Sequence, residues 1–451
     1  MAAAPPPPPS LISPAAAVGL AAVSIAAYQL IFALVVVALP RRAVAARVLS
    51  LAPLAVAAWA VNRCAVARAG PPQRQAPLLG LLIIHWLGLA EYVLVSRVDA
   101  AKLSELAAGA VVAPDDDAVP SDSAAERKQK KQQQQQQQES GKFGVGRQIW
   151  QALSLSCNAR RLGTEWEVKN VYRRRLPGSQ QQAGDGGGSS SSSSKMRFLA
   201  HVVPRIALCW LVVDALMQAP PPEPHLVAAA KQTPWRLWTL TGEDLGFRAA
   251  ATVLFWLTAY CVVYILIHVG AVASVALGLS TPAFWPHLFG PLSELCTIRG
   301  FWGTFWHQRL RRTLTAFSDV IADRVLLMPR GGLASRYARL FLAFAISGLL
   351  HHPTDTVQGL PATETASVAF FLMQPVGILV EDAAQALTRR WPLPRGARAA
   401  AGYVWVALFL VCTTPTWMFS IARLGQTPDL LPVKVARPLL AMLRREQTQL
   451  A

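Results

Sequence analysis

Apolar runs long enough to cross a membrane recur along this chain. The first, Ala15–Leu39, is 25 residues long and carries no charged side chain. About 20 such residues cross a hydrocarbon core of about 30 Å as a helix, and lipid leaves the backbone few alternatives to the helix. Charged residues make up 15% of the 451 residues, whereas soluble domains average about 25%. The sequence therefore predicts an all-α polytopic membrane protein and argues against a disordered chain or an ordinary cytosolic enzyme.

Seven further runs are candidates for membrane spans. They are Ala43–Val61, Ala76–Ser96, Phe198–Met217, Ala250–Leu279, Leu340–Leu350 with its flanks, Ala366–Val380 and Gly402–Ile421. The runs at 340–350 and 366–380 are short, so they could instead be tilted, re-entrant or buried among other helices. The sequence thus predicts about eight transmembrane helices.

Basic residues after the first span predict the orientation of the chain. Arg41, Arg42 and Arg47 follow that span, so the positive-inside rule places the N-terminus in the lumen. The start lacks both the basic region of a cleaved signal peptide and the character of a transit peptide. The endoplasmic reticulum is therefore the expected membrane.

Changes in composition divide the chain into four segments. Residues 1–96 hold the N-terminal spans, 97–197 form a hydrophilic loop, 198–425 hold the remaining spans, and 426–451 form a tail. The loop contains a Gln run at 132–138 and a Gly/Ser tract at 184–194, which we expect to be flexible because such compositions bury little apolar surface. The island Phe143–Arg175 between them has enough apolar residues to pack.

Polar groups inside spans are costly and therefore suggest function. The groups of this kind are His85 with Glu91, His268, His351 with His352, and Glu381 with Asp382. For His85 and His268 a structural role carries more weight. Glu381 and Asp382 end an apolar run, where a position at the membrane interface accounts for them.

His351 stands at the end of the apolar run Leu340–Leu350. Desolvation at such a position favours the neutral imidazole, which can accept a proton as a general base. From the residues alone, a helix-end histidine bonded to a carbonyl is an equally good interpretation.

Motifs for several other chemistries are absent from the sequence. HExxH, GxSxG, GxxxxGK[ST] and GxGxxG do not occur, which argues against a zinc protease, a nucleophile elbow and the common nucleotide loops. The six cysteines form no CxxC pair, and eight histidines are too few for the histidine boxes of metal-dependent desaturases. His351 and Asp355 form an HxxxD, the spacing of a soluble acyltransferase family, which we interpret as a coincidence because Pro353 intervenes. No metal site is expected.

Two other classes of protein stay open at this point. A transporter would use the embedded His and Glu side chains as a proton relay, although inverted repeats are not visible. A membrane scaffold would bind partners through its Gln-rich loop. Nucleic acid is not an expected partner despite the net charge of +18, because the basic residues flank the spans. The oligomeric state is open.

Three segments together resemble a known family. They are Arg160–Asn170 (RRLGTEWEVKN), Arg299–Arg312 (RGFWGTFWHQRLRR) and Ser347–His351 (SGLLH). In sequence, order and spacing they are similar to the RGIGxxWxVKN, RxFWGRxWHQxxR and SGxxH boxes of the fungal wax-synthase-like branch of the membrane-bound O-acyltransferases. The resemblance covers roughly residues 160 to 390. It departs from the family at Arg161-Leu162-Gly163, which lacks one glycine, and at Thr304, where relatives have Arg or Lys.

The resemblance implies an acyl-CoA:alcohol O-acyltransferase with a catalytic tunnel in the membrane. The segment 198–425 would be its catalytic membrane domain. The acceptor would be a lipophilic alcohol such as a terpenoid-type secondary metabolite, and acetyl-CoA the expected donor. A long-chain wax ester synthase is the alternative. Acyl-CoA would be a co-substrate, with no bound cofactor, and the lipid bilayer would be the surrounding partner.

The resemblance also assigns roles to residues of this sequence. His351 is the expected catalytic base and His307 the second catalytic-site residue. An oxyanion formed from the thioester needs a hydrogen-bond donor, which His307 or Gln308 could supply, with Trp306 and His352 close by. The expected acyl-CoA-binding residues are Arg299, Arg309, Arg311, Arg312, Lys169 and Asn170. Contact with anionic lipid is an equally weighted explanation for these cations.

Overall fold

The computed structural model describes residues 13–109, 144–172, 189–390 and 394–435. Within these ranges the chain is helical and contains no strand, so the all-α prediction is confirmed. The predicted Gln run at 132–138 lies outside the described residues.

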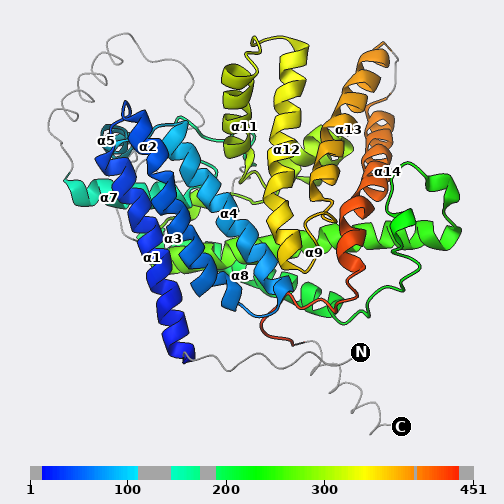
Figure 1. Ribbon diagram of the computed structural model, residues 1–451, viewed down its shortest axis with the longest axis horizontal. Helices are drawn as coiled ribbons and strands as arrows, with labels where there is room; N and C mark the ends of the chain where they lie inside the picture. Colours follow the sequence, from blue (N-terminus) through cyan, green and yellow to red (C-terminus); the bar gives the residue numbers. More distant parts are fainter. Residues whose placement is uncertain (1–12, 110–143, 173–188, 391–393, 436–451) are drawn as a thin grey trace, which may run out of the picture. The chain divides into compact units, whose positions relative to one another are not determined.

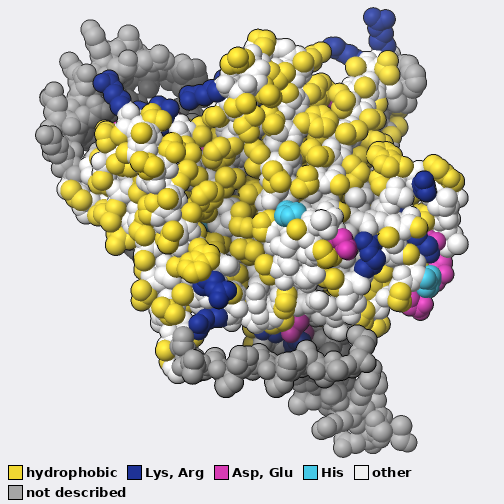
Figure 2. Space-filling view, in the orientation of Figure 1, with side chains coloured by type: hydrophobic (Ala, Val, Ile, Leu, Met, Phe, Trp, Pro, Cys, Tyr) yellow, Lys and Arg dark blue, Asp and Glu magenta, His cyan; other side chains and the backbone are white. Residues whose placement is uncertain are grey.

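Within the described residues, eight helical stretches are long and apolar enough to cross a membrane. They are Ala15–Ala38, Val44–Arg68, Pro72–Leu94, Ser193–Leu216, Gly242–Ala276, Leu333–Val357, Ser367–Leu387 and Arg395–Ala422. The two short runs at 340–350 and 366–380 both lie within these long helices, because their flanks extend the apolar core. Large apolar side chains such as Val18 and Val23 are exposed on the first span. Figure 2 shows that most of the side chains visible in that view are hydrophobic, which suits helices surrounded by lipid.

Two compact units make up the chain. The first consists of residues 1–70 and 81–165, and the second of residues 71–80 and 166–451. The boundaries of these two units differ from those of the four segments predicted from composition. The division into four segments stays a prediction.

In the first unit, α1 (Pro14–Ala38) packs on α3 (Leu51–Cys64) and on α7 (Val145–Cys157). Helix α5 (Ala100–Gly109) also packs on α7. Helix α7 lies in the island 143–175, where apolar residues predicted packing. The short α2 (Val44–Leu49) precedes α3, and η1 (Val66–Arg68) follows it.

In the second unit, two pairs of helices make the most extensive contacts: α8 (Ser189–Leu216) with α9 (Gly242–Ala276), and α12 (Leu333–Val357) with α13 (Ser367–Leu387). Helix α14 (Arg395–Ala422) packs on α13 and α9, and α11 (Arg311–Val320) packs on α12. Figure 1 shows α11, α12, α13 and α14 standing next to one another. Helix α4 (Pro72–Leu94) contributes its first residues to this unit and the rest to the first.

The start of α8 differs from the expectation for the Gly/Ser tract at 184–194. Helix α8 begins at Ser189, so the end of the tract is helical. An apolar run follows directly, and elongation of an existing helix costs far less than its nucleation. The adjacent span therefore explains why a serine-rich segment continues it.

Helix α9 begins at a capping box. The Thr241 hydroxyl oxygen accepts from the Asp244 N–H at 3.2 Å, and the Asp244 carboxylate accepts from the Thr241 N–H at 3.0 Å. Two N–H groups without intrahelical partners are thereby satisfied. This cap fixes the start of the 35-residue helix, whose Trp256 packs against Trp302 and Trp306 of the site described next.

Candidate active site

The segment Arg299–Arg312 crosses the second unit without forming a regular helix. It starts with α10 (Ile298–Gly300), continues as a π-helical turn at Phe301–Phe305, and ends at α11. The Trp306 N–H donates to the Phe301 carbonyl at 2.7 Å and closes the turn. Turns of π-helix occur frequently at functional sites.

Two side chains hold the beginning of this segment. The Thr297 hydroxyl accepts from the Gly300 N–H at 2.8 Å, and the Glu381 carboxylate accepts from the Ile298 N–H at 2.6 Å. Gly300 has no space for a side chain, because a Cβ there would lie 2.3 Å from the Glu294 carbonyl oxygen. Glu381, read from the sequence as interfacial, is therefore buried and caps a backbone N–H.

Gln308 holds the middle of the segment. Its side-chain amide donates to the carbonyls of Trp302 at 3.2 Å and Trp306 at 2.6 Å, and it is 4% exposed. Its carbonyl oxygen accepts from Arg311 at 3.3 Å. Both ends of this amide are thus bonded to neighbours in the same segment.

His351 lies on α12 between two aromatic rings. Its imidazole stacks on Phe371 of α13, with ring centroids 4.8 Å apart and planes 10° apart. The edge of the Trp417 indole meets it at 5.0 Å and 63°. Within the part of the chain that the structure describes, neither ring nitrogen makes a hydrogen bond. Aromatic packing therefore orients the half-buried imidazole and leaves its polar atoms available.

Asp355 holds the Trp417 indole in place. It lies four residues after His351 on α12, is 0% exposed, and accepts from Trp417 Nε1 at 2.9 Å. A donor–acceptor pair buried in this way is costly to break from one side only. The HxxxD spacing that we interpreted as a coincidence thus connects His351 to Asp355 through Trp417, and not by direct contact.

Gly348 allows α12 and α13 to approach closely next to His351. A Cβ at this glycine would lie 2.8 Å from Val368 Cα and 3.2 Å from Phe371 Cβ, both on α13. No real Cβ makes contacts this short with backbone, so α13 would have to move. The glycine of the SGLLH segment therefore sets the distance between His351 and the ring that stacks on it.

A series of aromatic rings connects His307 to His351. His307 lies beside Trp306 at 5.3 Å between centroids, and Trp306 lies 6.4 Å from Trp302. Trp302 in turn lies 5.7 Å from Phe371, which stacks on His351. A single cluster of aromatic rings thus connects the two histidine-bearing segments.

Buried Gln374 fixes the Trp302 ring within this cluster. Trp302 Nε1 donates to Gln374 Oε1 at 3.1 Å, and the Gln374 amide donates to the Phe370 carbonyl at 3.0 Å. The sequence analysis did not single out Gln374, Phe371 or Trp417. A polar Gln in the middle of a span was the one available signal, since aromatic residues in spans look like ordinary apolar ones.

Some of the predicted acyl-CoA-binding cations already have partners. Arg299 forms an ion pair with Asp382, with Nη2 and Oδ2 2.5 Å apart. Arg311 donates to the Gly303 carbonyl at 2.5 Å and to the Lys169 carbonyl at 3.5 Å, and burial lowers the pKa of its guanidinium. Arg311 thus connects the segment to the loop of Lys169 and Asn170, two residues whose side chains are exposed.

The structure also places His352, His268, Arg309 and Arg312. His352 bonds to the Thr365 hydroxyl at 2.5 Å, and His268 bonds through Nδ1 to the Tyr264 carbonyl at 3.0 Å. Arg309 and Arg312 are partly buried on the same segment as His307. His352 and His268 thus each have a hydrogen-bonded ring nitrogen, whereas His351 has none among the described residues.

Comparisons with known proteins agree on one family. Residues 285–373 match the membrane bound O-acyl transferase family. Acetyltransferase ataH of Aspergillus terreus is 35% identical over 311 residues, covering 65% of this chain and 96% of that protein. Acetyltransferase nanB of Aspergillus nanangensis is 32% identical, with 64% and 71% covered. Acetyltransferase TRI7 of Fusarium sporotrichioides is 29% identical, with 63% and 67% covered. No solved structure gives a significant match.

Proposed function

The chain belongs to the membrane bound O-acyl transferase family and is an acyltransferase, and on that premise we propose that it transfers acetyl from acetyl-CoA to the hydroxyl of a lipophilic alcohol. The observation that carries the proposal is His351, whose imidazole is oriented by two rings while its nitrogens stay unbonded among the described residues. The acceptor class we favour is a terpenoid-type secondary metabolite.

The proposed reaction begins with proton transfer to His351. An alcohol is a weak nucleophile near neutral pH, so the imidazole takes the hydroxyl proton as the oxygen attacks the thioester carbonyl carbon. A tetrahedral oxyanion forms. It collapses by breaking the C–S bond, and the departing thiolate of coenzyme A takes up the proton held by His351. Atoms and charges balance without a metal or a redox partner.

The remaining predicted residues receive supporting roles in this proposal. The His307 N–H stabilises the oxyanion, since an electrostatic donor at that point lowers the barrier most. Trp306 positions His307 through ring contact at 5.3 Å, and Gln308 holds the shape of the segment. Arg309, Arg312, Lys169 and Asn170 are proposed to contact the coenzyme, whereas Arg299 is engaged by Asp382. His352 bonds to Thr365 through Nδ1, and we do not propose it as the base.

Two features favour acetyl over a long acyl chain. The relatives reported above are named acetyltransferases. The imidazole of His351 is also walled by Phe371 and Trp417, which suits a small acyl group. A long-chain wax ester synthase is the second candidate, because the eight spans allow an apolar substrate to enter from lipid. We further propose the endoplasmic reticulum as the membrane, with a lumenal N-terminus.

The test is acyl transfer by microsomes that contain the chain. Labelled acetyl-CoA and a labelled long-chain acyl-CoA are supplied separately with a pool of lipophilic alcohols, and microsomes without the chain are the control. Ester formed mainly from acetyl-CoA supports the proposal. Preference for the long-chain donor identifies the wax ester synthase instead. Absence of ester from both donors contradicts the proposed reaction.

A further inference from the structure

A pocket separate from His351 opens where α13 ends and α14 begins. Its volume is about 820 Å³. Small residues of the two helices form much of its wall, among them Ala384, Ala399 and Gly402. Gly402 is in close contact with the pocket floor, because a Cβ there would lie 2.2 Å from the Cys296 carbonyl oxygen. The pocket therefore has an apolar wall of small residues and lies where two helices end and begin.

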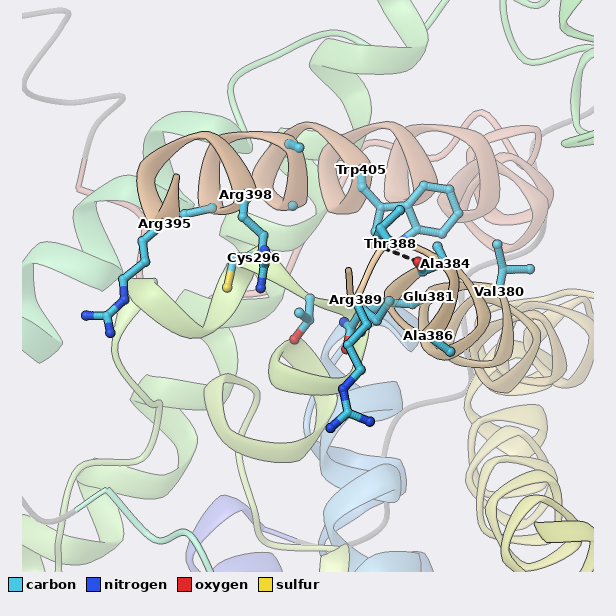
Figure 3. Close-up of a pocket in the computed structure, with 15 residues that line it drawn as sticks. Cys296, Val380, Glu381, Ala384, Ala386, Thr388, Arg389, Arg395, Arg398 and Trp405 are labelled. Atoms are coloured by element: carbon cyan, nitrogen blue, oxygen red, sulfur yellow. Dashed lines mark hydrogen bonds between the residues drawn. The ribbon is translucent and has the colours of Figure 1, made fainter. Parts of the chain in front are cut away.

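Three arginines line this pocket. Figure 3 shows the side chains of Arg389, Arg395 and Arg398 extending from the helices toward the lower side of the view, with Trp405 and Val380 at the other end. All three are exposed, and none forms an ion pair with another of the described residues. The nearby acid Asp382 is already paired with Arg299 and Arg336. These arginines therefore carry positive charge that the described part of the chain does not neutralise.

The acid that lines the pocket does not compensate that charge. Glu381 is 6% exposed and is occupied by the Ile298 N–H at 2.6 Å. The three exposed arginines thus leave this pocket with positive charge that no described acid neutralises, which favours a ligand that brings anionic acceptors.

The position of the pocket relates it to the candidate active site. Phe371, which stacks on His351, and Glu381 are ten residues apart on α13, which corresponds to about 15 Å of helix. Cys296 and Thr297, which also line the pocket, lie three and two residues before the Arg299–Arg312 segment. A long amphiphile with its anionic end at the arginines could therefore run along α13 toward the imidazole.

We propose that this pocket binds the phosphate ester of an amphiphile. Guanidinium groups match phosphate oxygens in planar, bidentate pairs, and the apolar wall accommodates an attached chain. Two molecules at a membrane carry this chemistry: coenzyme A, the donor, and an anionic phospholipid. Only the first source rests on the proposed function. Arg309, Arg312, Lys169 and Asn170, proposed above to contact the coenzyme, do not line this pocket. The test below therefore decides whether the phosphates of coenzyme A are held here or at those residues.

The test measures binding and does not require catalysis. The full chain is placed in nanodiscs of phosphatidylcholine, and the affinities for coenzyme A and for pantetheine, which lacks phosphate, are measured by titration calorimetry. The variant is Arg395→Gln/Arg398→Gln. Arg390→Gln is the matched control, because Arg390 is exposed at the same helix end and does not line the pocket. Loss of charge-assisted bonds predicts about tenfold weaker coenzyme A binding in the double variant, with pantetheine unaffected.

A second arm of the experiment tests whether the phosphate ester comes from a phospholipid. Nanodiscs with added phosphatidic acid are compared with phosphatidylcholine alone, and the thermal stabilisation by phosphatidic acid is measured for the same three proteins. Its loss in Arg395→Gln/Arg398→Gln, with coenzyme A binding unchanged, supports the pocket and identifies phospholipid as the source. If Arg390→Gln matches the double variant in both arms, or if the double variant changes neither, the proposal is overturned. A failure of acyl transfer alone leaves both binding results interpretable.

Discussion

The buried ion pair of Arg161 and Glu91 in the first compact unit differs from the half-buried His351 of the second in how its polar atoms are bonded. In the first, Arg161 is 2% exposed and Glu91 is 0% exposed, and they form an ion pair at 2.7 Å. The other Glu91 oxygen accepts from the Ser96 hydroxyl at 2.6 Å, and the Arg161 guanidinium lies 3.3 Å from the Tyr92 ring centroid. In the second, the ring nitrogens of His351 are left unbonded among the described residues.

This difference separates side chains that hold helices together from those that can bind a substrate. A buried charge is costly unless it is paired and hydrogen-bonded, and Arg47 in the first unit accordingly donates to the carbonyls of Pro40, Val93 and Val98 and to that of Leu39. A group whose bonds are all made inside the protein has none left for a ligand. His351 is oriented by packing alone and keeps that capacity.

The largest effect on stability is expected at Glu91. Glu91→Ala leaves the Arg161 guanidinium buried without its counter-charge, which costs about 3–5 kcal/mol. His351→Ala removes a half-buried ring that no hydrogen bond holds, and we expect about 1–2 kcal/mol. Thermal unfolding in detergent, followed by size-exclusion chromatography, measures both. Equal losses of stability in the two variants would remove the distinction between the paired Glu91 and the unbonded His351.

Closer packing beside His351 is expected to have the next largest effect. Gly348→Ala pushes Val368 and Phe371 away from α12, and overpacking of this kind costs about 1–3 kcal/mol. Because Phe371 moves off the imidazole, the acyl transfer rate should fall as well. Gly270→Ala on α9 is the control, since a Cβ there meets nothing within 4 Å. An unchanged rate in Gly348→Ala would show that the stacked geometry is unimportant.

Variants of the contact between Asp355 and Trp417 distinguish an effect on the orientation of His351 from an effect on the stability of the protein. Trp417→Phe removes the indole donor and leaves a buried carboxyl oxygen without it, which costs about 1–2 kcal/mol. The double variant Trp417→Phe/Asp355→Leu removes both partners and should regain part of the stability. If the pair orients His351, kcat stays low in the double variant while the KM for acetyl-CoA is unchanged. Recovery of kcat together with stability would assign the pair a structural role only.

The smallest effect is expected at Asp323, a partly exposed acid outside the spans. Arg330 and Arg339 hold Asp323 at 2.5 Å each and lower the pKa of its carboxyl to about 2. The folded-state pKa lies below the unfolded one, so the stabilisation is present above about pH 4 and is lost as the pH falls toward 2. Thermal unfolding across that range should change slightly more in the wild type than in Asp323→Asn. An identical pH dependence would mean that these pairs contribute nothing to stability.

The fold was predictable to a large extent because lipid restricts the backbone to helices. Apolar runs located all eight spans, and even the short runs at 340–350 and 366–380 lie inside long helices. The position of His351 at the end of such a run was visible in the sequence, and its role as the base stays a prediction. The rings of Phe371 and Trp417 were not, because they are distant in sequence and an aromatic residue in a span has no distinguishing pattern.

Pairings between spans and loops could not be predicted from the sequence either. Glu91 was grouped with His85, but it pairs with Arg161, 70 residues away, while His85 bonds to Tyr28 and Gln29. A long-range ion pair leaves no periodic signal in one sequence. For the same reason the pairing of Arg299 with Asp382 could not be foreseen.

The central claim is that His351, and not its neighbour, is the base. The most direct measurement compares ester formation by His351→Ala and His352→Ala in microsomes, normalised to folded protein. General-base catalysis is worth about 10²–10⁴ in rate, so His351→Ala should lose activity by at least that factor. His352 is bonded to Thr365, and His352→Ala should retain most of its activity. Full activity in His351→Ala, or its loss in His352→Ala alone, would contradict the account.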